Sequence, residues 1–392
     1  MTPAPNTFRT YILTPLEELY EPLWEDLLKA SEKNGFRIRS IFIADAAWQG
    51  QSGVLNEDKL GNDRKFVPSS PTTRPLTSRS QAAWFDHSRD LLHMINQLRA
   101  EMPRPLVGIG HSFGATIVTY VALMHPRLFS TLVLFDPVMQ YRGGGPTVGR
   151  DPLSLSAVRR DLWPSADAAA ASFRRSAFYA GWDPRVLAAW LNHGVRPTPT
   201  LLYPDPADAG KVTLTSTKHQ EVFTYLRPTL QAVDPRSGRR VFDRRRLPDI
   251  SDDGLRIVGA NKLYRPEVPN VALQLPQLRP GVLWFFGGAS ATSPPDVRRE
   301  KLELTGVGVG GSGGVAAGRV KEYVLEGVGH LVCMDDPKTC AREAAAWIGP
   351  EIERWREEER ELESWYRKST REKQVLDDEW WGFMGVKPPS KL

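Results

Sequence analysis

Cysteine is nearly absent from this chain of 392 residues, and long apolar runs are absent altogether. The two cysteines, Cys333 and Cys340, stand at a spacing that matches no metal-binding pattern, so we expect reduced, partly buried side chains and no metal site. No window of about 18 uninterrupted apolar residues occurs, which argues against a membrane span. The N-terminus, MTPAPNTFRTYILTP, has no basic region followed by a long apolar stretch and does not resemble a secretory signal.

The composition is that of an ordinary globular protein, with 41% hydrophobic and 25% charged residues. The length allows two or three domains, or one core that carries a large insertion. The formal charge of +5 mildly favours anionic ligands, but much of the basicity is local, and we expect no nucleic-acid partner. It concentrates in RSGRRVFDRRR, where Arg244, Arg245 and Arg246 belong either to a solvated loop or to a docking patch for a phosphorylated substrate.

Short apolar runs alternate with helical patterns in the first third of the chain, which favours βαβ units around a parallel sheet. The alternation stops after Asp136 and resumes at Gly281. We therefore expect an α/β fold with a mostly parallel sheet flanked by helices, a core of residues 1–137 and 277–392, and a large insertion, 138–276, that would form a cap. The expected strands are 10–13, 38–43, 105–110, 131–135, 281–286 and 319–325; the expected helices are 16–33, 84–102, 115–124, 166–179, 184–192, 216–225 and 337–371; a loop is expected over 48–81.

The more specific assignment to an α/β-hydrolase fold depends on the pentapeptide Gly110-His111-Ser112-Phe113-Gly114, which lies between an apolar strand and an apolar helix. A G-x-S-x-G match alone is unspecific, but strand, tight turn and helix in this order form the nucleophile elbow of α/β-hydrolases. Side chains at 110 and 114 would collide with neighbouring backbone, so glycine is needed there. We expect Ser112 to present its hydroxyl at the carboxyl edge of the sheet; the alternative is a structural βα turn without chemistry.

A serine hydroxyl is a weak nucleophile at neutral pH, and it needs a base that is itself oriented by an acid. In this fold the order along the chain is serine, acid, histidine. Of the seven histidines, only His330, in Gly327-Val-Gly-His, lies just beyond the last expected strand, where a loop can bring its imidazole over Ser112. His111 adjoins Ser112 in the turn, and their side chains should point apart.

Two aspartates are candidates for the acid. The acid usually follows the next-to-last strand, but the loop there, GGASATSPPD, offers no carboxylate before Asp296. Asp136 directly ends the strand after the elbow helix, and adjacent strand ends lie about 5 Å apart. We prefer Asp136 to Asp296.

The oxyanion hole needs two backbone N–H groups, and the first should come from Phe113, the residue after the nucleophile. The second should come from the turn after the first strand, where Pro15 has no N–H and Leu16 is our candidate. Few residues precede Thr10, so we expect the sheet to lack one or two of the leading strands common in this fold.

Three features lie outside this site. Gly308-Val-Gly-Gly-Ser-Gly313 matches a dinucleotide-binding fingerprint, but it precedes a strand rather than a helix, so we expect a mobile loop near the rim of the active site. The segment EIERWREEERELESWYRK is typical of a solvated helix or of one that flanks a homodimer contact. The terminal Ser390, Lys391 and Leu392 match the signal that a peroxisomal import receptor reads at the extreme C-terminus.

YEPLWEDLL, GHSFG, LFDPV, GVGVGGSGG, GVGHLV and the terminal SKL together resemble the fungal peroxisomal α/β-hydrolases of secondary metabolism. That group includes acyl-CoA hydrolases of mycophenolic acid biosynthesis and hydrolases associated with host-selective toxin biosynthesis. The resemblance extends from about Leu19 to the C-terminus, and it places the group's serine, aspartate and histidine on Ser112, Asp136 and His330.

The resemblance implies a serine hydrolase that cleaves an acyl-CoA thioester to the free acid and coenzyme A, without a metal or redox cofactor. The cap would shape the acyl pocket, and its arginines would bind the phosphates of coenzyme A. A carboxylester hydrolase, lactonase or lipase would use the same triad, and a non-catalytic pathway protein that kept the fold is a third reading, supported by the atypical turn at Pro15. Epoxide or haloalkane hydrolysis is disfavoured, because those reactions require a carboxylate at position 112.

Overall fold

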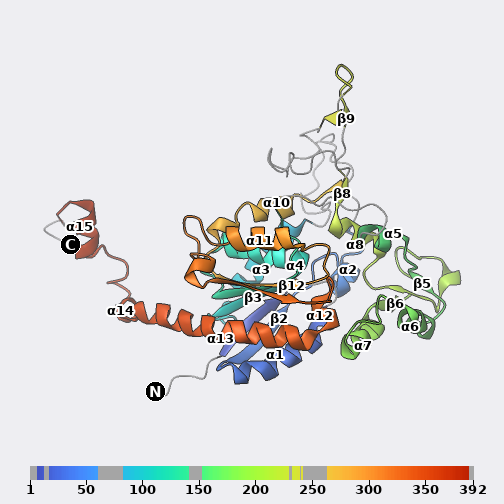
Figure 1. Cartoon of the computed structure of the whole chain (residues 1–392), viewed down its shortest axis with the longest axis horizontal. Coiled ribbons are helices and arrows are strands. Elements are labelled where there is room, and N and C mark those ends of the chain that lie inside the picture. The colour runs from blue at the N-terminus through green and yellow to red at the C-terminus, as the bar shows by residue number, and fades with distance from the viewer. Residues whose placement is uncertain are drawn as a thin grey trace.

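A computed structural model of the chain describes residues 7–12, 17–60, 83–140, 152–228, 232–238, 240–241 and 263–387. Its core is a six-stranded sheet in the order β13-β12-β4-β3-β1-β2, and every strand pair in it is parallel (Figure 1). The strands are β1 (Thr7–Ile12), β2 (Arg37–Ile43), β3 (Leu106–His111), β4 (Thr131–Phe135), β12 (Gly281–Gly287) and β13 (Val320–Leu325).

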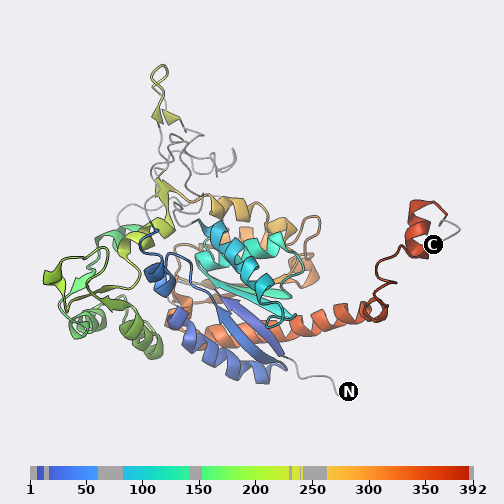
Figure 2. The same cartoon turned by 180° about the vertical axis from the view of Figure 1, so that it is seen from behind.

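Helices cover both faces of this sheet (Figures 1 and 2). On one face α1 (Glu21–Lys33) packs against α13 (Pro337–Glu361), next to η1 (Glu17–Tyr20) and α12 (Val332–Asp335). The other face carries α3 (Trp84–Gln97), α4 (Phe113–Met124), α10 (Glu267–Ala272), η3 (Leu275–Gln277) and α11 (Pro295–Leu304).

The three central strands are buried along their whole length, because both of their faces are covered. Their side chains alternate between two apolar clusters. In β12, Leu283 and Phe285 join the cluster on the α1 and α13 side, whereas Val282, Trp284 and Phe286 join the cluster on the α3 and α4 side. The continuous apolar runs of the sequence therefore form the middle of the sheet.

The longest described part of the expected cap, residues 152–228, is called the insertion segment below. It lies beside the carboxyl edge of the sheet, to the right in Figure 1. It consists of α5 (Pro152–Val158), β5 (Leu162–Trp163), α6 (Ala166–Arg175), α7 (Pro184–His193), β6 (Val195–Pro197), η2 (Pro206–Asp208), β7 (Val212–Leu214), α8 (Lys218–Tyr225) and β8 (Arg227–Pro228). β5, β7 and β6 form a small antiparallel sheet. Two short hairpins follow, in which β9 (Ala232–Val233) pairs with β10 (Arg240–Val241) and β8 pairs with β11 (Leu263–Tyr264).

The insertion segment contacts the core through hydrogen bonds to backbone carbonyls. Asp183 N–H donates to the Met334 carbonyl at 2.8 Å, and Trp84 Nε1 donates to the Thr224 carbonyl at 3.1 Å. Its aromatic side chains, which include Trp163, Phe173, Tyr179, Trp182 and Trp190, continue the apolar cluster of α1 and α13.

The observed elements differ from the sequence expectation at several places. The helices expected over 84–102 and 166–179 end earlier, at Gln97 and Arg175. The helix expected over 16–33 is divided, because η1 ends at Tyr20 and α1 begins with a proline in its first turn. The loop expected over 48–81 contains a short helix, α2 (Gly50–Leu55). The long helix expected over 337–371 ends at Glu361, and α14 (Glu363–Arg367) and α15 (Asp378–Met384) follow it as separate helices.

The glycine-rich loop is not near the rim of the active site, so that expectation is wrong. It connects α11 to β13 through η4 (Val315–Ala317), and in a parallel sheet the segment that enters a strand lies at the amino edge. Hydrogen bonds from Gly308 N–H to the Pro276 carbonyl and from Ser312 N–H to the Leu278 carbonyl attach it to the segment before β12.

Both cysteines are free and fully buried, more deeply than the sequence suggested. Among the residues that the structure describes, no helix is long and apolar enough to cross a lipid bilayer.

Candidate active site

In the elbow, Ser112 is the single residue between the end of β3 and the start of α4. Its φ of 56° lies in the left-handed region, which is strained for a residue with a side chain. Two backbone hydrogen bonds hold it there: Ser112 N–H donates to the Phe135 carbonyl at 2.9 Å, and the Ser112 carbonyl accepts from Val138 N–H at 3.2 Å. The neighbouring strand β4 and the residues after it therefore support the turn.

Glycine is required at position 110 for steric reasons. A Cβ built there would lie 2.6 Å from both the backbone nitrogen and the Cα of Ala115. Any side chain at Gly110 would push the first turn of α4 away from β3 and displace the hydroxyl of Ser112.

Ser112, His330 and Asp136 form one chain of hydrogen bonds, although β13 and its loop are far from the elbow in sequence. His330 Nε2 lies 2.8 Å from Ser112 Oγ, and His330 Nδ1 lies 2.6 Å from Asp136 Oδ2. The carboxylate can only accept, so Nδ1 carries the proton and Nε2 is free to accept the serine proton. Asp296 is exposed in the first turn of α11 and does not take this position.

The register of the sheet explains why Asp136 reaches the histidine. β3 and β4 pair with His111 opposite Phe135, so Ser112 and Asp136 are each the first residue beyond a matched strand end. Asp136 N–H also donates to the Phe285 carbonyl at 2.6 Å, which fixes the turn after β4 to the neighbouring β12.

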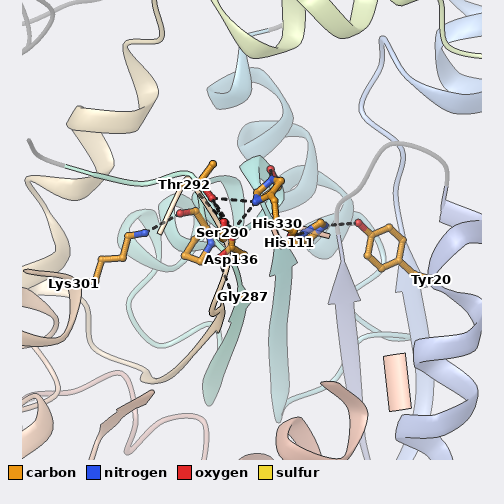
Figure 3. A network of polar contacts seen from close by, with 10 residues as sticks. Tyr20, His111, Asp136, Gly287, Ser290, Thr292, Lys301 and His330 are labelled. Carbon is orange, nitrogen blue, oxygen red and sulfur yellow. Dashed lines mark hydrogen bonds and ion pairs between the residues drawn. The ribbon is translucent and has the colours of Figure 1, made fainter. Parts of the chain in front are cut away.

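The Asp136 carboxylate is fully buried, and both of its oxygens accept hydrogen bonds (Figure 3). Oδ2 accepts from the hydroxyls of Ser290 at 2.5 Å and Thr292 at 2.6 Å, and Oδ1 accepts from Gly287 N–H at 3.1 Å. Burial by itself would raise the pKa of Asp136, but the hydrogen bond and charge of His330 and the two hydroxyls together hold that pKa below its usual range. Asp136 therefore stays ionised and able to stabilise an imidazolium.

His111 points away from Ser112, as the turn geometry predicts, and contacts two other parts of the site. Its Nδ1 lies 2.7 Å from Tyr20 Oη, and its Nε2 lies 2.9 Å from the backbone carbonyl of His330. Burial, and secondarily the charge of His330, lower the pKa of His111 to about 4, so this imidazole is neutral at physiological pH.

Lys301 lies behind Asp136 and is almost completely buried. Its Nζ donates to the Pro137 carbonyl at 2.9 Å and lies over the rings of Trp284 and Phe286, at 6.0 Å and 5.4 Å from their centroids. Burial lowers the pKa of Lys301 to about 7, while the attraction of Asp136 opposes that shift. The side chain thus fixes the backbone immediately after the acid.

One of the two expected oxyanion donors has a described position. Phe113 is the first residue of α4, and the N–H groups of a first helical turn have no acceptor within their own helix. Leu16, the other candidate, lies outside the described residues, and so do Arg244, Arg245, Arg246 and the terminal Ser390, Lys391 and Leu392.

Ser290, Thr292, Lys301 and Tyr20 contribute to the network, and sequence reasoning did not identify them. A signal for the two hydroxyls was present, because GGASATSPPD occupies the place where this fold usually carries its acid. Such a loop, lacking a carboxylate, still lies beside an acid on the neighbouring strand and can donate to it. Lys301 and Tyr20 carry no local sequence signal.

The arrangement can perform nucleophilic acyl transfer: a hydroxyl on an elbow, a base that can accept its proton, and an ionised acid behind the base. In the described part of the chain, no group of three or more His, Cys, Asp or Glu side chains is arranged to hold a metal ion.

This fold and this arrangement define a class of protein. The sequence profile of the alpha/beta hydrolase family matches residues 24–343, and the chain belongs to that family.

Individual relatives agree with this assignment. The chain is 39% identical to the type I acyl-CoA thioesterase mpaH of Penicillium brevicompactum, over 97% of this chain and 85% of that protein. It is 26% identical to the abhydrolase domain-containing protein ACTT2-1 of Alternaria alternata, over 63% of this chain and 84% of that protein. Among solved structures, the peroxisomal alpha-beta-hydrolase Lpx1 of Saccharomyces cerevisiae superposes with a TM-score of 0.61 at 15% identity, covering 97% of this chain and 84% of Lpx1, which shows a shared fold.

Proposed function

We propose that this protein is an acyl-CoA thioesterase in which Ser112 is the nucleophile, His330 the general base and acid, and Asp136 the residue that orients and stabilises His330. The observation that carries the proposal is the continuous hydrogen-bonded chain from Ser112 Oγ through both ring nitrogens of His330 to Asp136. The thioester class comes from the relative mpaH, which shares 39% of its residues over nearly the whole chain.

In the first half-reaction, His330 Nε2 takes the Ser112 proton while Oγ attacks the thioester carbonyl carbon. Phe113 N–H and Leu16 N–H stabilise the resulting oxyanion. Collapse breaks the carbon–sulfur bond, and coenzyme A leaves as a thiol with the proton from His330. In the second half-reaction His330 activates water, which attacks the acyl-serine and releases the free acid and Ser112. One water is consumed for each thioester.

The proposed substrate pocket involves residues 138–276 acting as a cap. A cavity of about 380 Å³ lies between the core around Trp48 and Leu60 and the insertion segment, where Leu201, Ser216 and Phe223 line it. Apolar side chains such as Trp48 and Phe223 offer the part of the wall that an acyl chain requires, and polar side chains such as Arg196 and Gln220 line the rest. Arg244, Arg245 and Arg246 would bind the phosphates of coenzyme A, because guanidinium groups pair well with phosphate.

The proposal also places the enzyme in the peroxisome of a fungus, in secondary metabolism, through recognition of Ser390, Lys391 and Leu392 by an import receptor. A fluorescent protein fused to the N-terminus should become punctate, and removal of Leu392 should disperse it. We further propose that the protein acts as a homodimer.

The catalytic proposal is tested by release of free thiol from a panel of medium-chain and aromatic acyl-CoA substrates. Ser112→Ala should reduce turnover at least about 10⁴-fold and abolish labelling by a fluorophosphonate, because it removes the attacking atom. Ser130→Ala, on a serine outside the site, is the matched control. Turnover undiminished in Ser112→Ala would refute the serine mechanism.

A second measurement separates thioesters from oxygen esters. Reversing the charge at 244–246 should raise KM for acyl-CoA but leave hydrolysis of a p-nitrophenyl ester unchanged. A wild-type enzyme that hydrolyses only the ester would contradict the thioesterase assignment while leaving the triad intact.

A further inference from the structure

The helix α11 fully buries one side chain, and that side chain is charged. Lys301 is 2% exposed, whereas every other residue of this helix is exposed or partly exposed. Lysine is almost never fully buried in a protein unless its charge is paired. Lys301 donates to a backbone carbonyl, that of Pro137, and an uncharged side chain of similar length would fill the same space without the desolvation of a charge. Packing alone therefore does not account for a lysine at this position.

The ammonium group of Lys301 is directed at the turn that carries the acid. Figure 3 shows Lys301 and His330 on opposite sides of Asp136. The rings of Trp284 and Phe286 lie close to Nζ and compensate part of its desolvation, because the faces of aromatic rings attract cations. The lysine thus reaches the turn as a cation, and the hydrogen bond that it makes there goes to the backbone.

The residues after β4, 136–139, are called the acid turn. The φ of Asp136 is 36°, which lies in the left-handed region and is strained for a residue with a side chain. A strained backbone persists only where its surroundings fix it. Within the turn, the Pro137 carbonyl accepts from Met139 N–H at 3.0 Å, and Lys301 Nζ holds the same carbonyl from outside at 2.9 Å. Lys301 therefore helps to hold the strained conformation of the acid.

The acid turn also supports the nucleophile. Val138 N–H donates to the Ser112 carbonyl at 3.2 Å, and the Val138 carbonyl accepts from the hydroxyl of Thr116, in the first turn of α4, at 2.7 Å. Pro137 lies between Asp136 and Val138 in the chain. A shift of the Pro137 peptide would therefore move the acid on one side and the support of the elbow on the other.

We propose that Lys301 is a positioning residue of the hydrolysis reaction, which fixes the acid turn from behind and thereby keeps Asp136 and Ser112 in place for His330. The two ring nitrogens of His330 meet Asp136 at 2.6 Å and Ser112 at 2.8 Å. Displacements of about 1 Å can reduce the rate of such an arrangement about 100-fold. The inference rests on the proposed function, because it assumes that these three residues perform the hydrolysis.

The charge of Lys301 has an effect of its own. A cation behind the Asp136 carboxylate opposes the formation of a second cation, the imidazolium of His330, in front of it. Without that charge His330 is protonated more easily, so the acid limb of the pH–rate profile should move to higher pH. The charges that act on Lys301 are those of Asp136 and of Glu300 on its own helix, and the aromatic rings of β12 add none.

The first test is Lys301→Met, which removes both the hydrogen bond and the charge and keeps the length of the side chain. We expect kcat for a p-nitrophenyl ester to fall about 30-fold per folded molecule with little change in KM. The temperature of thermal unfolding should be equal to that of wild type or higher, because a buried charge is removed and the Pro137 carbonyl still accepts from Met139. A role in packing alone would lower stability and leave kcat per folded molecule unchanged.

Lys211→Met is the matched control. Lys211 lies in the insertion segment, where its Nζ donates to Asp208 at 2.6 Å. The same substitution there should leave kcat and its pH dependence unchanged. If Lys211→Met and Lys301→Met have the same kcat as wild type, the proposal is wrong.

Lys301→Gln separates the hydrogen bond from the charge, because its amide can donate to the Pro137 carbonyl but is neutral. We expect this variant to recover kcat to within about fivefold of wild type. The acid limb of kcat/KM should lie at higher pH than in wild type in both the methionine and the glutamine variant. An acid limb that moves in neither variant, or a glutamine variant as slow as the methionine variant, overturns the positioning role.

The outcome is distinguishable from a failure of the catalytic proposal. If Ser112→Ala keeps its turnover, the serine mechanism is wrong, whatever the Lys301 variants do. If Ser112→Ala is inactive while Lys301→Met turns over ester at the wild-type rate, the triad stands and only the role of Lys301 is refuted.

Discussion

At the scale of single residues, His111 connects the elbow, the histidine loop and η1. A backbone carbonyl can only accept, so the contact with the His330 carbonyl requires the proton of His111 on Nε2. Nδ1 is then an acceptor, and Tyr20 O–H must donate to it. The rings of His111 and His330 are 5.2 Å apart, so a neutral His111 avoids repulsion when His330 becomes charged during the reaction.

We predict that His111→Leu lowers kcat by about 10- to 100-fold with little change in KM, because one or two buried hydrogen bonds that position His330 are lost. His111→Gln should recover most of this loss, since its amide can donate to the His330 carbonyl and accept from Tyr20. The measurement is kcat and KM across pH with an ester substrate.

His87→Leu is the control for this prediction. His87 is also a buried histidine whose pKa burial lowers to about 4, but it lies beside Trp48 on the other side of the sheet. Its variant should lose stability and keep kcat per folded molecule. Equal kcat in His111→Leu and wild type would contradict a positioning role.

At the scale of elements, β3 and α4 form the elbow. Their backbones approach so closely at Gly110 that no side chain fits there. Gly110→Ala should destabilise the protein by at least about 1–3 kcal/mol, because the new methyl group overlaps the backbone of Ala115. Fluorophosphonate labelling of the folded fraction should fall as well, since Ser112 moves. Thermal unfolding and labelling rate are the two measurements.

Gly382→Ala is the matched control for Gly110→Ala, because it makes the same substitution in a helix where there is space. A Cβ at Gly382, inside α15, would meet nothing within 4 Å, and alanine favours a helix over glycine. This variant should be as stable as wild type or slightly more so. If Gly110→Ala behaves in the same way, the steric account of the elbow is wrong.

At the scale of the whole molecule, some buried groups lower the free energy of unfolding as the pH falls and others raise it. Burial lowers the pKa of His87 and His111 to about 4, so the unfolded chain takes up their protons first as the pH falls below about 6.5 and stability is lost. Burial raises the pKa of Asp45 to about 7, so the folded chain takes up that proton first and stability is gained over the same range. The pH dependence of the wild-type free energy of unfolding contains both contributions, and single variants separate them.

Between about pH 7 and pH 5, His87 should lower the free energy of unfolding of the wild type by about 2 kcal/mol. We predict that His87→Gln does not show this part of the loss. Asp45→Asn should change the same difference in the opposite direction. Urea unfolding of the three proteins at both pH values measures this. The histidine account fails if the wild type and His87→Gln show parallel pH dependence.

The sequence was a good guide wherever the relevant information is local. A buried strand, a glycine turn and an apolar helix predicted the elbow at Ser112. Asp136 directly follows a strand and His330 lies in the loop after one, which made both candidates without knowledge of the contacts. Helix ends were less predictable, as the end of α13 at Glu361 shows, because no proline or glycine marks it.

The sequence by itself determined the fold class, the strand ends and the order of serine, aspartate and histidine, because periodicity and turn residues act over a few neighbours. Only the tertiary structure decided that Ser290 and Thr292 bind the acid, that Lys301 lies behind it and that Tyr20 fixes the tautomer of His111. Those contacts join residues about a hundred or more positions apart, and side-chain distances across a sheet depend on register and packing, which no local pattern encodes.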